Sequence, residues 1–278
     1  MKTLKTAFLL TALTLLLLFL GAAFGGERGM TIALIFAVLM NGTAYFFSDK
    51  IALMSSGAQP ISKEQAPRLY EVMERLAAKS NLPMPNMYLI PQPAPNAFAT
   101  GRNPSHASVA VTQGLLELMD DEELEGVIAH ELSHVRNYDI LTSSIAATIA
   151  GAITWLARMG FWFGGGSDRE RSSGLTGILM LILAPLAALL LQLGISRQRE
   201  YQADASGARM VGHPYGLIRA LEKLGAYNKR IPMDVPPTTS ALMIVAPLSA
   251  GQIFSGLFST HPPLADRIAQ LRAMTVTR

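Results

Sequence analysis

The chain has 278 residues, of which 50% are hydrophobic, and its net charge at pH 7 is +3. So high a hydrophobic fraction points to the lipid bilayer rather than to a water-soluble protein. The chain contains no cysteine, which excludes disulfides, thiolate metal ligands and a cysteine nucleophile. Its basic residues are scattered without a Lys/Arg-rich block, so we expect no nucleic-acid partner.

Two apolar stretches lie near the N-terminus. Residues 6–24 carry no charge and would be about 28 Å long as a helix, which matches the roughly 30 Å core of a bilayer. Residues 30–48 are a second such stretch, separated from the first by the short segment GGERG. We therefore predict an N-terminal transmembrane hairpin over 1–48. A cleaved signal peptide is the alternative for the first stretch, because lysines precede it and small residues follow it.

A second pair of apolar stretches covers 141–163 and 175–196, joined by a polar glycine-rich linker. This pattern predicts a second transmembrane hairpin over 141–196, and thus contact with the lipid bilayer. The first stretch of the pair contains Arg158 and several hydroxyl side chains, so a buried helix pair that does not span is the alternative. By the positive-inside rule, the tips of both hairpins lie outside and both termini lie in the cytoplasm.

The intervening regions, 49–140 and 197–278, have the composition of water-soluble protein. Residues 64–79 show the spacing of an amphipathic helix, and residues 87–90 and 107–112 are short β-like runs. We predict that the two regions lie together on the cytoplasmic side. The expected fold class is a polytopic membrane protein, mainly α with a small β-sheet.

A helix with catalytic character is predicted to begin after Asp120. Along it, His130 and His134 are about 40° apart around the helix axis, so both imidazoles can reach one ion. Glu131 lies beside the ion without ligating it. This H-E-x-x-H pattern suits metal-assisted hydrolysis, in which zinc lowers the pKa of a water molecule to about 7 and the glutamate takes that water's proton. Two structural histidines are the alternative.

A catalytic zinc site needs a third protein ligand. The best candidate is Glu200, in a helix-like segment directly after the last apolar stretch. Asp204 lies one turn further on the same face, where it could accept a hydrogen bond from a ligating imidazole. The alternative for Glu200 is a solvated charge beside Arg197 and Arg199.

The motifs occur in an order that resembles a known family. They are the two apolar N-terminal stretches, the paired later ones, and four sequence segments: NAFATG (96–101), HELSHVRNYD (130–139), REYQADASGA (199–208) and STHPPLADRI (259–268). Over nearly its whole length the chain resembles the HtpX-type membrane zinc metalloproteases, relatives of the CAAX prenyl endopeptidases. The resemblance implies that 49–140 and 197–278 together form a cytoplasmic catalytic domain, a gluzincin-like zinc protease domain.

The resemblance implies a set of roles for residues of this chain. They are His130, His134 and Glu200 as Zn²⁺ ligands, Glu131 as the base, Asp204 as an orienting residue, His261 as an oxyanion stabiliser, and Asn96 as a substrate-side residue before an edge strand. Arg267 either supports this region or lies on a terminal amphipathic helix.

The resemblance also implies a biological setting. The protein would be a multi-pass protein of the bacterial cytoplasmic (inner) membrane, with a cytoplasmic active site and with protein or peptide substrates. Those substrates would be misfolded or damaged membrane proteins, in quality control and the stress response. The alternatives are a non-enzymatic membrane scaffold or transporter and an intramembrane-cutting protease. The sequence leaves the oligomeric state open.

Overall fold

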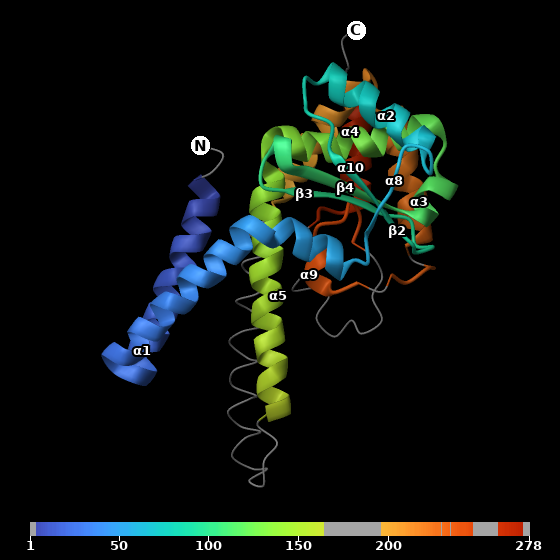
Figure 1. Cartoon of the computed structure of the whole chain (residues 1–278). Coiled ribbons are helices and arrows are strands. Elements are labelled where there is room, and N and C mark those ends of the chain that lie inside the picture. The colour runs from blue at the N-terminus through green and yellow to red at the C-terminus, as the bar shows by residue number, and fades with distance from the viewer. Residues whose placement is uncertain (1–3, 164–195, 229, 234, 247–260, 275–278) are drawn as a thin grey trace.

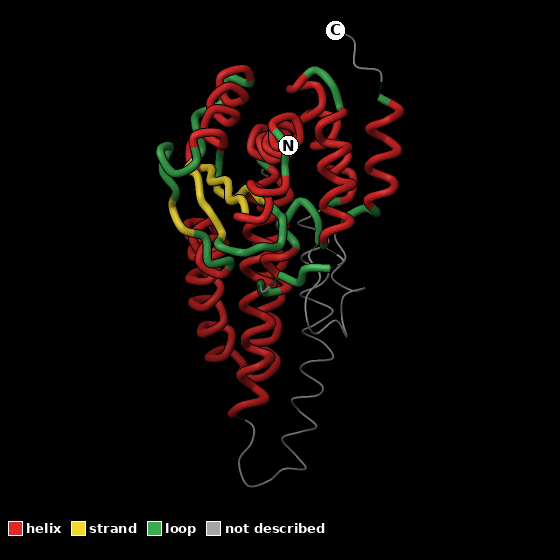
Figure 2. The backbone as a smooth tube through the Cα atoms, turned by 90° about the vertical axis from the view of Figure 1, so that its right-hand side faces the viewer, coloured by secondary structure: helices red, strands yellow, loops and turns green. Residues whose placement is uncertain are grey.

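The computed structural model describes residues 4–163, 196–228, 230–233, 235–246 and 261–274. A globular domain lies at one end of the molecule, and the apolar helices α1 and α5 extend from it toward the other end (Figures 1 and 2). The elements in chain order are α1 (Leu4–Ser55), β1 (Gln59–Pro60), α2 (Pro67–Lys79), β2 (Asn86–Ile90), β3 (Ala97–Gly101), the 3₁₀ turn η1 (Pro104–His106), β4 (Ala107–Thr112), α3 (Gln113–Leu118), α4 (Asp121–Asn137), α5 (Asp139–Phe163), α7 (Arg197–Val211), α8 (Tyr215–Tyr227), α9 (Pro237–Ser240) and α10 (Leu264–Ala273). The prediction of a mainly helical fold with a small sheet is confirmed.

The sheet has the strand order β1-β2-β4-β3. The pair β2 and β4 is parallel, whereas β1 with β2 and β3 with β4 are antiparallel. The runs predicted at 87–90 and 107–112 form β2 and β4. Strand β3 lies at one edge of the sheet, next to the helix that carries the histidines.

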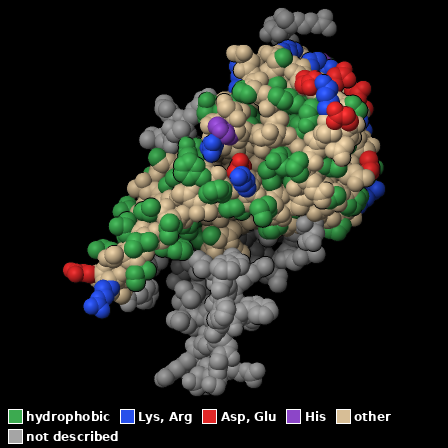
Figure 3. All heavy atoms as spheres, in the orientation of Figure 1, with side chains coloured by type: hydrophobic (Ala, Val, Ile, Leu, Met, Phe, Trp, Pro, Cys, Tyr) green, Lys and Arg blue, Asp and Glu red, His purple; other side chains and the backbone are tan. Residues whose placement is uncertain are grey.

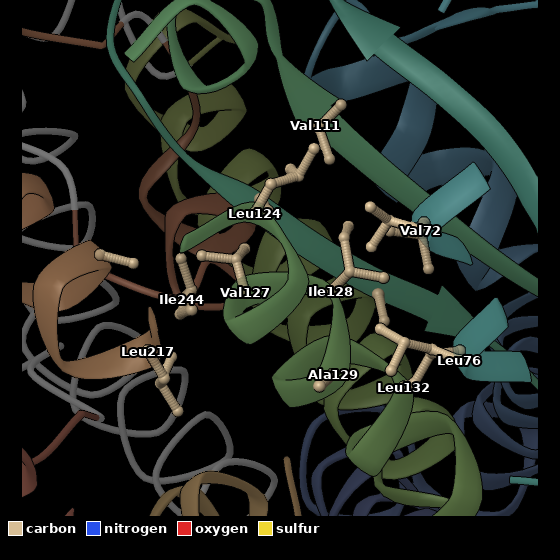
Figure 4. Packing of buried hydrophobic residues seen from close by; sticks show 14 of the residues in the cluster. Val72, Leu76, Val111, Leu124, Val127, Ile128, Ala129, Leu132, Leu217 and Ile244 are labelled. Carbon is tan, nitrogen blue, oxygen red and sulfur yellow. The ribbon is translucent and has the colours of Figure 1, made fainter. Parts of the chain in front are cut away.

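The two faces of the sheet are covered by different elements. Val109 and Val111 of β4 belong to a core formed with α2, α4 and α8 (Figure 4), whereas Ala110 between them faces the opposite side. There it packs in a second cluster that includes Leu53 of α1 and Met243. This alternation follows from the two-residue period of a strand.

Helix α4 lies at the centre of the globular domain. Its start matches the prediction, since Asp120 accepts a hydrogen bond from the backbone N–H of Glu123 while the Glu123 side chain accepts one from Asp120. This capping box satisfies backbone donors at the helix start. Glycine allows close helix contacts, because a Cβ at Gly126 would lie 2.5 Å from the backbone nitrogen of Leu217 in α8.

Helix α1 folds back on itself. Gly26 has φ of +55°, which interrupts the helix, and the two arms approach so closely that a Cβ on Gly21 would lie 2.5 Å from the carbonyl oxygen of Gly29. Further along, Asn41 Nδ2 donates to Thr14 Oγ1 across the arms (2.8 Å). The arms thus form a helical hairpin whose tip points away from the globular domain (Figure 1).

The second arm of α1 is apolar and exposed. Among the described residues, Gly25–Ser55 is one helix of 31 residues that is long and apolar enough to cross a membrane, while Thr6–Phe19 and Asp139–Thr154 are shorter apolar helices. Apolar side chains cover the arms, whereas charged side chains gather on the far end of the globular domain (Figure 3). Most of the second predicted hairpin beyond α5 lies outside the described residues.

Candidate metal centre

Three potential metal ligands meet at the contact between α4 and α7. The structure brings one donor atom each from His130, His134 and Glu200 within 4.8 Å of one another. The two imidazole Nε2 atoms are 3.2 Å apart. The Glu200 carboxylate oxygens lie 3.8 Å from Nε2 of His130 and 3.5 Å from Nε2 of His134.

These separations fit a tetrahedral metal ion. With bonds of about 2.0–2.2 Å, neighbouring ligand atoms around tetrahedral zinc lie roughly 3.3–3.6 Å apart. Two imidazoles and one carboxylate also match the ligand types of catalytic zinc sites, which leave a fourth position for water. The donor set is therefore compatible with a divalent ion such as zinc.

The protonation states of two of these groups also favour a cation. Burial lowers the pKa of His130, so that its imidazole is neutral, as ligation requires. Burial alone would raise the pKa of Glu200, but the charges around it, that of His261 first, outweigh burial and hold its pKa well below the usual range. Glu200 is thus an anion at neutral pH.

A buried ion pair contacts His130. Asp204, one turn after Glu200 on α7, accepts a hydrogen bond from Nδ1 of His130 at 2.9 Å. Arg267 of α10 donates to both carboxylate oxygens of Asp204, at 2.8 and 2.7 Å, and to the carbonyl of Ile244 at 2.7 Å. The Arg267 side chain is 0% exposed, which selects the supporting position over a place on an exposed amphipathic face.

Glu131 lies on the wall of a cavity that two of the three potential ligands also line. The other wall residues include His134, Glu200 and His261. Burial raises the pKa of Glu131 to about 7, and the Glu200 carboxylate acts in the same direction, while the backbone N–H of Ala99 in β3 hydrogen-bonds its carboxylate. A carboxyl group with a pKa near neutrality can both accept and return a proton.

The two remaining predicted site residues have different surroundings. His261 lies in the cavity wall, with Nδ1 3.2 Å from Glu200 Oε2 and Nε2 donating to the carbonyl of Ala241 at 3.2 Å. Asn96 is fully buried instead, and its Nδ2 donates to the carbonyl of Val245 at 2.8 Å. The structure thus brings His261 to the metal centre, whereas Asn96 directly precedes strand β3 and its side-chain amide contacts Val245.

Two residues at the centre were not singled out from the sequence. Asp139 lies 3.4 Å from Nδ1 of His134, and Ala99 presents its N–H to Glu131. Asp139 follows His134 by five residues, a spacing that brings a carboxylate beside the end of the same helix and could have been noticed. The Ala99 backbone group gives no signal in a sequence.

A helix with two histidines and an adjacent buried glutamate, completed by a carboxylate from a second helix, defines a metallopeptidase. Comparison with known proteins agrees, since residues 63–275 match Peptidase family M48. The chain belongs to this family and is a metalloprotease. The alternative of a non-enzymatic scaffold or transporter is set aside.

The similar curated proteins carry the name of the family that the sequence motifs indicated. The "Protease HtpX homolog" of Desulfatibacillum aliphaticivorans is 56% identical over 96% of this chain and 88% of that protein. The one from Syntrophobacter fumaroxidans is 52% identical over 97% of this chain and 98% of that protein. The crystal structure of S. mikatae Ste24p aligns with a TM-score of 0.54 at 20% identity, covering 97% of this chain and 64% of that one, and shows the fold alone.

Proposed function

We propose that this chain is a zinc-dependent endopeptidase of the bacterial cytoplasmic (inner) membrane that cleaves misfolded or damaged membrane proteins at the cytoplasmic face. The observation that carries the proposal is the meeting of His130, His134 and Glu200 beside Glu131 in a domain joined to exposed apolar helices. We assign the first three residues as the zinc ligands. The catalytic domain would comprise 49–140 and 197–278.

The contacts of these residues support a role for each of them. Bound zinc would supply Lewis acidity and lower the pKa of a water molecule to about 7. Glu131 would accept the proton of the water that attacks the peptide carbonyl and return it to the leaving amine, because its carboxylate lines the cavity beside His134 and Glu200. Asp204 would hold His130 with Nε2 toward the metal position, because it accepts the proton on Nδ1.

Substrate contacts are proposed on the other side of the cavity. Strand β3 lies at the sheet edge and Ala99 lines the cavity, which supports pairing of an extended substrate along this strand. The side-chain amide of Asn96 donates its hydrogen bond to the carbonyl of Val245. Asn96 would therefore act on the substrate indirectly, by positioning strand β3, which directly follows it. His261 would donate to a substrate oxyanion that replaces the Ala241 carbonyl as the partner of Nε2.

Membrane insertion is supported by the exposed arms of α1. Phe19 is 70% exposed and Ile32 68% exposed, and exposed apolar surface of this extent favours a lipid environment. Both α1 and α5 extend beyond the globular domain, α5 straight down and α1 obliquely to the lower left in Figure 1. We propose that 1–48 and 141–196 are transmembrane hairpins and that the catalytic domain lies on the cytoplasmic side.

The catalytic proposal is tested with the full chain purified in detergent. Glu131→Gln should retain stoichiometric zinc but cleave an unfolded protein substrate at least about a hundredfold more slowly, because the general base is lost. Glu122→Gln, on the same helix but 40% exposed, is the matched control and should cleave like wild type. Undiminished cleavage by Glu131→Gln would remove the mechanism.

The topology is tested by labelling single cysteines in intact cells, which is clean because the chain has none of its own. Glu27→Cys lies at the tip of α1, and Glu64→Cys lies on the globular domain; both positions are exposed. A membrane-impermeant reagent added outside should label the cysteine at 27 and leave the one at 64 unlabelled. The reverse pattern would invert the proposed orientation.

A further inference from the structure

A single residue, Tyr138, joins helix α4, which carries His130 and His134, to helix α5. Helix α4 ends at Asn137 and is capped by Tyr138, whose φ of +62° is left-handed and whose N–H donates to the carbonyls of His134 and Val135. Helix α5 begins with the next residue, Asp139. The backbone path therefore places the Asp139 carboxylate beside the last turn of α4, next to the imidazole of His134.

The contact between His134 and Asp139 parallels the one that orients the other histidine. Nε2 of His134 faces His130 and Glu200, so the proton of a ligating ring must be on Nδ1. That atom lies 3.4 Å from Asp139 Oδ2, just as His130 Nδ1 faces its own carboxylate. Metal-binding histidines generally carry such a partner, which fixes both the tautomer and the ring orientation.

Asp139 has a second neighbour, Arg199, which lies in the first turn of α7. Nη1 of Arg199 donates to Asp139 Oδ1 at 3.5 Å, so the two carboxylate oxygens serve two different partners. The side chains of Asp139 and Arg199 are only 15% and 13% exposed, and both line the cavity of the metal centre. Arg199 also directly precedes Glu200 in the first turn of α7.

We propose that Asp139 and Arg199 form a positioning pair: Asp139 orients His134 for metal binding, and Arg199 holds Asp139 in place. The pair joins the start of α5 to the start of α7, and therefore fixes the spacing between His134 at the end of α4 and Glu200 beside Arg199. It acts through the ligands and touches no reacting atom. This inference rests on the proposed zinc site.

The experiment measures zinc affinity of the full detergent-purified chain by competition with a chelator. Asp139→Asn keeps the shape of the side chain but loses its charge, and should weaken zinc binding about 10- to 100-fold. Arg199→Ala should weaken it less, and Arg199→Lys should restore part of that loss. Because Arg199 acts through Asp139, adding Arg199→Ala to Asp139→Asn should cause no further loss.

Two matched controls separate positioning from general effects. Asp266→Asn removes an exposed acidic residue from the first turn of α10, and Arg197→Ala removes an exposed basic residue from the first turn of α7. Both should bind zinc like wild type. The absorption spectrum of bound Co²⁺ should change in Asp139→Asn and not in the controls, a readout that altered stability alone would not move.

The outcomes distinguish the inference from the proposal beneath it. A wild-type chain that binds no zinc would overturn both. Wild-type binding together with an Asp139→Asn affinity equal to that of Asp266→Asn would overturn only the positioning pair. Full additivity of the losses at 139 and 199 would likewise overturn it, because Arg199 would then act by another route. If Asp139→Asn fails to fold, the zinc affinities of Arg199→Ala and Arg199→Lys provide the test. A loss in Arg199→Ala that Arg199→Lys partly restores would support the pair, and wild-type affinity of Arg199→Ala would overturn it.

Discussion

Replacing Arg267 with alanine should destabilise the protein more than any exposed substitution. The guanidinium makes two hydrogen bonds to Asp204 and one to the Ile244 carbonyl, and its side chain is 0% exposed. Breaking a buried ion pair by removing one partner costs about 3–5 kcal/mol, because the other charge stays buried without compensation. A cost of this size is a large fraction of the roughly 5–15 kcal/mol that stabilises a typical domain.

The assay is urea unfolding of the full chain in detergent, followed by circular dichroism, with chelator present so that metal binding does not contribute. Arg272→Ala is the matched control on the same helix, since its side chain is 65% exposed and its pair with Glu222 should contribute about 0–1 kcal/mol. Arg267→Lys should lie between the two, because an ammonium cannot reproduce the two-pronged contact. Equal losses for Arg267→Ala and Arg272→Ala would refute the reasoning.

Three further predictions concern the helix cap, a helix crossing and the metal. Asp120→Ala should lower the free energy of unfolding by about 0.5–2 kcal/mol. The backbone N–H of Glu123 lowers the pKa of Asp120, so the cap stabilises the fold above the usual carboxyl pKa and is lost as pH falls through the lowered value; an acid titration that leaves the wild-type advantage unchanged would contradict this. Gly216→Ala should cost about 1–3 kcal/mol, since its Cβ would lie 2.1 Å from the carbonyl oxygen of Glu122, and a thermal midpoint equal to wild type would argue against so close a crossing. Burial lowers the pKa of His134, but the surrounding carboxylates outweigh burial and raise this pKa to about 9. Zinc must therefore displace a proton from His134, and the affinity of the chain for zinc should rise up to about tenfold per pH unit below pH 9. A zinc affinity that does not change with pH in chelator competition would exclude this.

Local rules account for the parts of the fold that the sequence predicted well. The start of α4 depends on Asp120 and the residues of its first turn, and the facing of His130 and His134 depends only on helical geometry. These features involve residues within a few positions of one another. The same holds for β2 and β4, which are short runs of β-favouring residues.

Strand β3 was less accessible to pattern reasoning. All five residues of β3 are buried, because the strand packs against helices α4 and α5 in addition to pairing with β4. A strand buried on both faces shows no polar alternation, so periodicity cannot separate it from other apolar segments. Strand β1, with two residues, is too short to leave any pattern.

Long-range partners were the hardest to infer. Glu200 could be nominated because a catalytic metal needs a third ligand, but nothing local selects Arg267, which is 137 positions from His130 in the chain. Its alternative on an amphipathic surface helix has the same sequence pattern. Only the packing of α10 against α7 and α8 distinguishes the two.

The contact between Arg267 and Asp204 also bears on the order in which the site assembles during synthesis. At a ribosomal rate of about 5–20 residues per second, Arg267 is made roughly 7–27 seconds after His130, a delay that follows from the 137 positions between them. Until then the buried Asp204 carboxylate lacks the guanidinium that neutralises it in the folded chain. The ion pair that supports His130 therefore forms only after the segments that carry Asp204 and Arg267 have both been synthesised.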